Sequence, residues 1–104
     1  MTDSLTDTEY HHLVEETLAV LQRQLDGFLD FLDWETHGDI LYIQFEDGEK
    51  VVINKQLPLH QLWFACKEEA KQFAWSGSEW IDVRGGGTLN TTVNRLFERK
   101  GIHF

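Results

Sequence analysis

In the first quarter of the chain, hydrophobic residues recur at steps of three, four and seven positions. Such steps return to the same side of an α-helix, so the pattern predicts an amphipathic helix over residues 10–28. Gly27 lies near the end of this segment, where helices often stop. The positions that form the apolar face are Tyr10, Leu13, Val14, Leu18, Leu21, Leu25 and Phe28. Candidate N-cap residues precede the helix and are Thr6, Asp7 and Thr8.

After this helix the hydrophobic period changes to two, which is typical of strands with one buried face. Leu41, Ile43 and Phe45 alternate with polar or amphipathic residues. Asp47-Gly48 follows and is a strong hairpin signal. The predicted strands are 32–36, 39–46, 50–55, 60–65, a short strand that contains Phe73 and Trp75, and 79–83.

A second helix is predicted after the glycine run 85–87. Thr88 is its expected N-cap, and one face carries apolar residues. These residues are Leu89, Val93, Leu96 and Phe97. A glycine run before a helix can also cradle a phosphate. However, this segment lacks the Gly-Lys-Ser/Thr ending of such loops, so a turn followed by an N-cap explains it better.

The order of helix, strands and helix defines an expected fold. Short connections between strands require antiparallel pairing. Two terminal helices on one face of such a sheet give an α+β, two-layer α/β sandwich. We expect a single domain over residues 1–104, with the other sheet face open to solvent.

Charge is distributed unevenly along the chain. The net charge is −9; residues 1–49 hold thirteen acidic residues and one basic residue, whereas residues 50–104 hold five and eight. This balance argues against nucleic acid and favours cations or basic partner surfaces, although an acidic surface can also serve solubility alone. Cys66 is the only cysteine, and no apolar run is long enough to span a membrane. The acidic segment 1–9 is unlike a signal or transit peptide, so we expect a cytoplasmic protein.

Residues 52–63 carry a recognisable pattern. A strand ending in Asn54-Lys55-Gln56 is followed by a turn at Pro58, and then by Gln61 and Trp63 on the next strand. The segment resembles the signature of the frataxin family in its bacterial form. The order of elements resembles that family along the whole chain, as do residues 9–11 and the pair Trp75 and Trp80 around a glycine turn.

The resemblance implies a role in iron handling and iron–sulfur cluster biogenesis. Family members bind ferrous and ferric iron on an acidic ridge of the first helix and first strand, and they bind the cysteine desulfurase. Carboxylate oxygens, with imidazole as a borderline partner, suit iron. The candidate metal ligands in this chain are His11, Glu15, Glu16, Asp26, Asp30, Asp33, Glu35 and Asp39.

Spacing supports a shared location for several of these residues. His11, Glu15 and Asp26 fall on one stripe of the helix, and Asp33 and Glu35 are in phase on the strand. No His-x-x-x-His or Glu-x-x-His pair is present, so we expect weak iron binding completed by water. The alternative is a solvated acidic face without a metal. The ridge is also thinner than in bacterial relatives, because residues 22–24 are Gln-Arg-Gln.

The open sheet face provides a second candidate site. Asn54, Gln56, Gln61 and Trp63 are expected on its solvent side, where a tryptophan among amides suits a protein-binding surface. The alternative is a Trp63 packed against neighbouring polar side chains. Other residues are assigned structural roles, namely Trp80 at the margin of the core, His60 after the proline turn, and Cys66 as a buried or half-buried small residue.

Three functions remain open from the sequence. The first is a non-enzymatic iron-binding protein that docks on the cysteine desulfurase and its iron–sulfur scaffold protein, and that is monomeric without metal. The second is an enzyme, either a ferroxidase or a hydrolase with paired carboxylates. Such catalysis needs an enclosed pair with separated pKa values, and no catalytic residue is assigned. The third is an acidic interaction module without metal.

Overall fold

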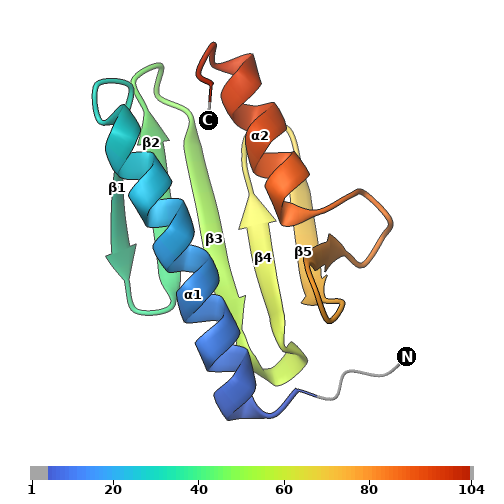
Figure 1. Cartoon of the computed structure of the whole chain (residues 1–104). Coiled ribbons are helices and arrows are strands. Elements are labelled where there is room, and N and C mark those ends of the chain that lie inside the picture. The colour runs from blue at the N-terminus through green and yellow to red at the C-terminus, as the bar shows by residue number, and fades with distance from the viewer. Residues whose placement is uncertain (1–4, 104) are drawn as a thin grey trace.

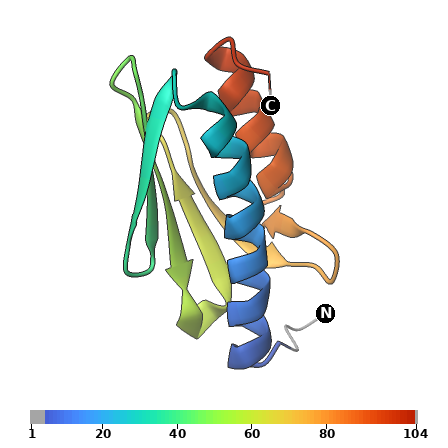
Figure 2. The ribbon, with the colours of Figure 1, turned by 60° about the vertical axis from the view of Figure 1, so that its left-hand side comes forward.

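Antiparallel pairing of consecutive strands organises the molecule, which we describe for residues 5–103 of a computed structural model. The sheet is a six-stranded meander in the order β1-β2-β3-β4-β5-β6, and α1 and α2 both pack on one of its faces (Figures 1 and 2). This confirms the predicted α+β two-layer sandwich. The elements are α1 (Asp7–Leu25), β1 (Leu32–His37), β2 (Ile40–Phe45), β3 (Lys50–Gln56), β4 (Gln61–Ala65), β5 (Ala70–Trp75), β6 (Trp80–Asp82) and α2 (Leu89–Arg99).

Most predicted boundaries are confirmed to within a few residues. Thr6 caps α1 by accepting a hydrogen bond from the Glu9 amide, while the Glu9 carboxylate accepts one from the Thr6 amide. The helix ends at Leu25 and gives way to a 3₁₀ turn over Asp26–Phe28, so the predicted end at Phe28 was three residues late. The acidic segment 1–9 was expected to be unlike a signal or transit peptide. Its residues 1–4 lie outside the described residues.

The segment after β4 differs from expectation. The pattern predicted only a short strand at Phe73 and Trp75, but β5 begins at Ala70. Lys71 points toward the helices and breaks the apolar pattern of the inner face. Its ammonium group donates to the Gly86 carbonyl at 2.6 Å and lies 3.5 Å from Glu69. These contacts satisfy the buried charge, which explains why a lysine is tolerated there.

The glycine run and Thr88 form a turn and a helix cap, as predicted. The Thr88 hydroxyl accepts a hydrogen bond from the Thr91 amide at 3.1 Å. Gly86 allows a close approach, because a Cβ atom there would lie 2.3 Å from an Asp82 carboxylate oxygen. The turn therefore needs glycine at this position for space.

The core lies between the inner sheet face and the helices. The alternating residues predicted to face inward are buried, and so are all four apolar residues predicted on α2. Trp80, expected at the margin of the core, is buried within it. Cys66 is half-buried against this core. Among residues 5–103, no helix is long and apolar enough to cross a membrane.

Tyr10 joins α1 to the connection between β3 and β4. Its buried hydroxyl donates to the Gln61 carbonyl at 2.6 Å and accepts from the Gln56 amide at 3.0 Å. Its ring stacks on His60, whose imidazole lies 2.8 Å from the Asp7 carboxylate. His60 therefore has the structural role expected for it, and burial raises the pKa of Tyr10.

Replacing Tyr10 with Phe is expected to lower the free energy of unfolding by about 1–3 kcal/mol, since a partly buried carbonyl and a partly buried amide would lose their partner. Chemical denaturation measures this change. A Tyr42→Phe variant is the matched control, because in the described residues its hydroxyl makes no hydrogen bond. Equal stabilities for the two variants would contradict the assigned role.

A second prediction concerns the β2–β3 hairpin, where Lys100 at the end of α2 contacts Asp47 and Glu49. The hydrogen bond from Lys100 lowers the pKa of each carboxyl group. Burial alone would lower the pKa of Lys100, but the same hydrogen bonds outweigh it and raise that pKa.

Because the folded-state pKa values of Asp47 and Glu49 are depressed, their stabilising contribution is present above their unfolded pKa values of about 4. It is lost as pH falls through the lower folded-state values. We expect an Asp47→Asn/Glu49→Gln variant to show a smaller loss of stability between pH 6 and pH 3 than the wild type. Parallel stability curves over that range would show that the hairpin contacts do not act in this way.

Candidate metal-binding and docking surfaces

We define the acidic ridge as the eight predicted ligands, which the structure places on α1, the turn after it, β1 and the β1–β2 turn. All eight side chains are exposed to solvent. In Figure 1, α1 crosses its face of the sheet obliquely, from the β3–β4 connection at the start of the helix to β1 at its end, and the ridge follows this path. The members are His11, Glu15, Glu16, Asp26, Asp30, Asp33, Glu35 and Asp39.

Glu15 and Asp39 border the same depression although they are 24 positions apart. They line one depression of about 250 Å³ between α1 and the β1–β2 turn. The Lys55 ammonium group lies 4.0 Å from an Asp39 oxygen at the same place. A cation that binds between Glu15 and Asp39 would therefore compete with Lys55 for the Asp39 carboxylate.

Three other ridge carboxylates already have polar neighbours. Asp26 accepts a hydrogen bond from the Trp34 indole at 2.8 Å. Glu16 lies 3.4 Å from His12, and Glu35 lies 3.2 Å from His37. Neither histidine was among the predicted ligands, although the spacing was a visible signal for both. His12 precedes Glu16 by four residues on a helix, and His37 follows Glu35 by two residues on a strand, so each pair shares one face of its element.

The ridge is extended rather than gathered at one point. Within residues 5–103, no group of three or more His, Cys, Asp or Glu side chains lies close enough to hold a metal ion together. An ion on this surface would take one or two protein ligands at a time, and water would complete its coordination. The ridge can therefore concentrate cations electrostatically, and it offers several alternative contacts to a basic surface.

The helix-free face of the sheet carries the second predicted set. Strand register places Asn54 directly beside Trp63, and Gln56 beside Gln61. All four residues are half-buried, and the Trp63 indole donates to the Gln61 side-chain oxygen at 2.8 Å. The predicted location on the uncovered face is confirmed, and the indole has the polar neighbours that the alternative interpretation expected.

Sequence reasoning missed two members of this surface. Gln72 pairs with Trp63 across β4 and β5, and Arg84 lines the same depression of about 260 Å³ beside the indole. The backbone amide of Val83 donates to the Gln72 carbonyl at 2.9 Å, which brings the segment after β6 to this place. The longer extent of β5, which the pattern did not predict, is what aligns Gln72 with Trp63.

Comparison with known proteins identifies the family. The family model described as a frataxin-like domain matches residues 3–101. An iron–sulfur cluster assembly protein CyaY from Shewanella baltica is 33% identical over 102 residues, covering 94% of each chain. Another CyaY, from Tolumonas auensis, is 38% identical over 85 residues and covers 82% of each chain. The chain belongs to the frataxin-like family.

Solved structures agree with this assignment. Frataxin from Psychromonas ingrahamii, a member of the CyaY family, matches with a TM-score of 0.85 at 26% identity over 95% of each chain. Trimeric frataxin from the yeast Saccharomyces cerevisiae, complexed with ferrous iron, matches with a TM-score of 0.70 at 22% identity. That match covers 95% of this chain and 88% of the yeast chain, and it supports the fold alone.

The Trp34–Asp26 hydrogen bond offers a built-in reporter for the ridge. We expect anaerobic addition of Fe²⁺ to broaden the Trp34 indole NMR signal at lower metal concentration than the Trp63 indole signal, because Asp26 contacts the Trp34 indole directly. In Asp26→Asn, the amide oxygen can still accept the hydrogen bond, but the negative charge is removed. The Trp34 indole signal should then no longer broaden at a lower Fe²⁺ concentration than the Trp63 indole signal. Simultaneous broadening of both signals in the wild type would argue against metal binding at Asp26.

Proposed function

We propose that this chain is an iron-binding protein of iron–sulfur cluster assembly that docks on the cysteine desulfurase. The proposal is carried by one observation: in a member of the frataxin-like family, a solvent-exposed acidic ridge lies next to a helix-free sheet face centred on Trp63. Relatives that share a third of its residues are named iron–sulfur cluster assembly proteins, which supports the same role here.

Iron is cargo in this proposal and not a resident cofactor. Exposed carboxylates and one imidazole suit Fe²⁺ and Fe³⁺, but they hold the ion weakly because water remains part of its coordination. The yeast frataxin solved with ferrous iron supports iron binding within the fold family. We propose that iron occupies one or two ridge carboxylates at a time, beginning with those that no lysine or arginine contacts.

The same carboxylates would serve docking. A ridge of negative charge accelerates encounter with a basic groove on the partner, and bound iron would weaken that attraction by neutralising it. The half-buried Trp63 and its amide neighbours would then supply the packed centre of the interface. We also propose that the metal-free protein is a cytoplasmic monomer that meets the desulfurase together with its scaffold protein.

A non-enzymatic role fits the ridge better than a ferroxidase does. Acid–base work by a carboxylate pair depends on burial that separates the two pKa values. Iron oxidation at a carboxylate site depends instead on several ligands gathered around the metal. All ridge carboxylates are exposed, and the pair that shares a depression, Glu15 and Asp39, has Lys55 beside it. A metal-free interaction module would share the docking surface but would show no iron-dependent change in ridge signals.

The test is binding to a purified bacterial cysteine desulfurase at low ionic strength. Reversing charge with Glu15→Lys/Asp39→Lys is expected to weaken binding by about tenfold or more, with most of the change in the association rate. The matched control is Glu79→Lys/Glu98→Lys, which changes charge equally at exposed sites away from the ridge. Equal affinity of the two double variants would refute the docking proposal.

A further inference from the structure

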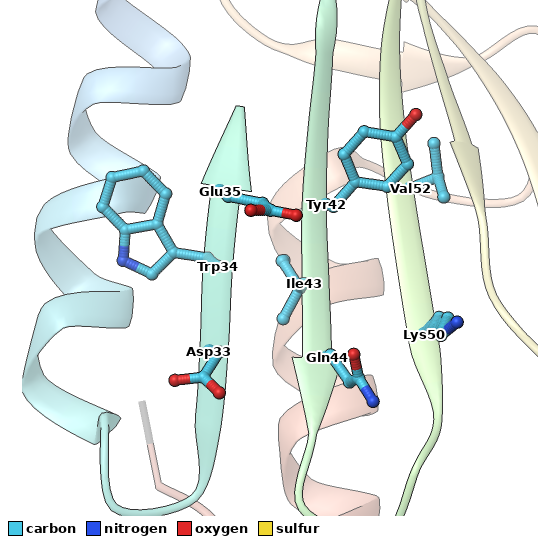
Figure 3. A pocket seen from close by; sticks show the side chains of 8 residues that line it. All are labelled: Asp33, Trp34, Glu35, Tyr42, Ile43, Gln44, Lys50 and Val52. Atoms are coloured by element: carbon cyan, nitrogen blue, oxygen red, sulfur yellow. The ribbon is translucent and has the colours of Figure 1, made fainter. Parts of the chain in front are cut away.

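A depression of about 590 Å³ lies on the helix-free face beside β1 (Figure 3). Two rows of paired residues form it across three strands. One row is Glu35, Tyr42 and Val52, and the other is Asp33, Gln44 and Lys50. This groove adjoins the depression beside Trp63: Val52 lines both, and the second depression is otherwise lined mainly by β4 and β5.

The acidic wall of the groove is accessible from the side. Asp33 and Glu35 lie on β1, the edge strand of the sheet, with about 7 Å between their positions along the strand. Both carboxylates are exposed, and neither contacts a lysine or arginine within residues 5–103. The groove therefore offers, at an open edge, two carboxylates that no lysine or arginine in this part of the chain contacts.

The floor of the groove is aromatic. Tyr42 lies directly across from Glu35 on β2, and the Glu35 side chain points toward that strand in Figure 3. The Tyr42 ring meets the His37 ring edge-on at 5.7 Å between centroids, and His37 also lies 3.2 Å from Glu35. His37 thus contacts both the carboxylate and the aromatic ring that border the groove, and this limits their movement.

This combination is selective for one type of side chain. A guanidinium group is planar, stacks on aromatic faces and bonds carboxylates through two parallel N–H groups, whereas an ammonium group is a compact, strongly hydrated point charge. Lys50 closes the far side, two strands and about 10 Å from Asp33, which is too far to neutralise that carboxylate. It instead disfavours a second cation.

We propose that this groove binds an arginine side chain from the basic surface of the protein partner, with the guanidinium group stacked on Tyr42 and paired with Asp33 or Glu35. The inference rests on the proposed docking function and adds a defined slot to it. Tyr42 is then a determinant of specificity that is separate from both the general charge of the ridge and the Trp63 surface.

The test titrates the whole protein with hexa-arginine and, separately, with hexa-lysine peptides, and follows the Tyr42 ring signals by NMR. We expect at least threefold tighter binding of hexa-arginine. Tyr42→Leu should remove this preference, Tyr42→Phe should keep it, and Lys50→Gln should strengthen binding of both peptides. Equal affinities for the two peptides, or a preference that survives in Tyr42→Leu, would overturn the arginine slot.

A second arm separates this inference from the docking proposal. Binding of the same variants to the cysteine desulfurase should weaken about fivefold in Tyr42→Leu and stay near the wild-type value in Tyr42→Phe. A desulfurase that binds wild type and Tyr42→Leu equally would refute the slot while leaving docking intact. If the wild-type protein does not bind the desulfurase but prefers hexa-arginine through Tyr42, the docking proposal fails and the slot stands.

Discussion

The packing of both helices on one face of the sheet is the constraint on which the rest of the structure depends. Each strand alternates between apolar residues that the helices cover and residues that no helix covers. Two helices leave the opposite face uncovered across all six strands (Figure 2). That face therefore presents half-buried aromatic and amide side chains, such as Tyr42, Trp63 and Asn54, without the helices above them.

The same packing brings the ridge to the uncovered face. Acidic residues are concentrated in the first half of the chain, which forms α1, β1 and β2. Because the middle and end of α1 lie beside the β1–β2 turn and β1, Glu15 and Asp26 lie near the carboxylates of β1 at one edge of the sheet. The second half supplies more basic residues, but several of them are already paired with acidic residues. Lys71 contacts Glu69, Arg99 contacts Glu68, and Lys100 contacts the β2–β3 hairpin.

Local periodicity was sufficient to predict most of the fold, because each element buries one regular stripe of residues. The inward positions Leu41, Ile43 and Phe45 follow directly from alternation. Features that depend on distant pairing were not predictable. The hydroxyl of Tyr10 bonds backbone groups 46 and 51 positions away, and Lys71 finds its acceptor at Gly86. No local pattern contains these contacts.

The candidate sites, too, were predictable from the sequence only in part. Alternation placed Asn54 and Trp63 on the outer face, and the resemblance to frataxins pointed to the ridge residues. The grouping of Glu15 with Asp39, and of Glu35 with His37 and Tyr42, depends on how α1, β1 and β2 sit together. Alternation and the resemblance therefore suggested which residues matter, while the packing of α1 and the strand register determined which of them share a depression.

Cross-saturation NMR on the complex with a cysteine desulfurase tests the central claim most directly. The account predicts that signal loss will be confined to the ridge on α1 and β1 and to outer-face residues of β2 to β5, including the side chains of Tyr42 and Trp63. Signal loss centred on the outward sides of α1 and α2, with the outer sheet face unaffected, would contradict it.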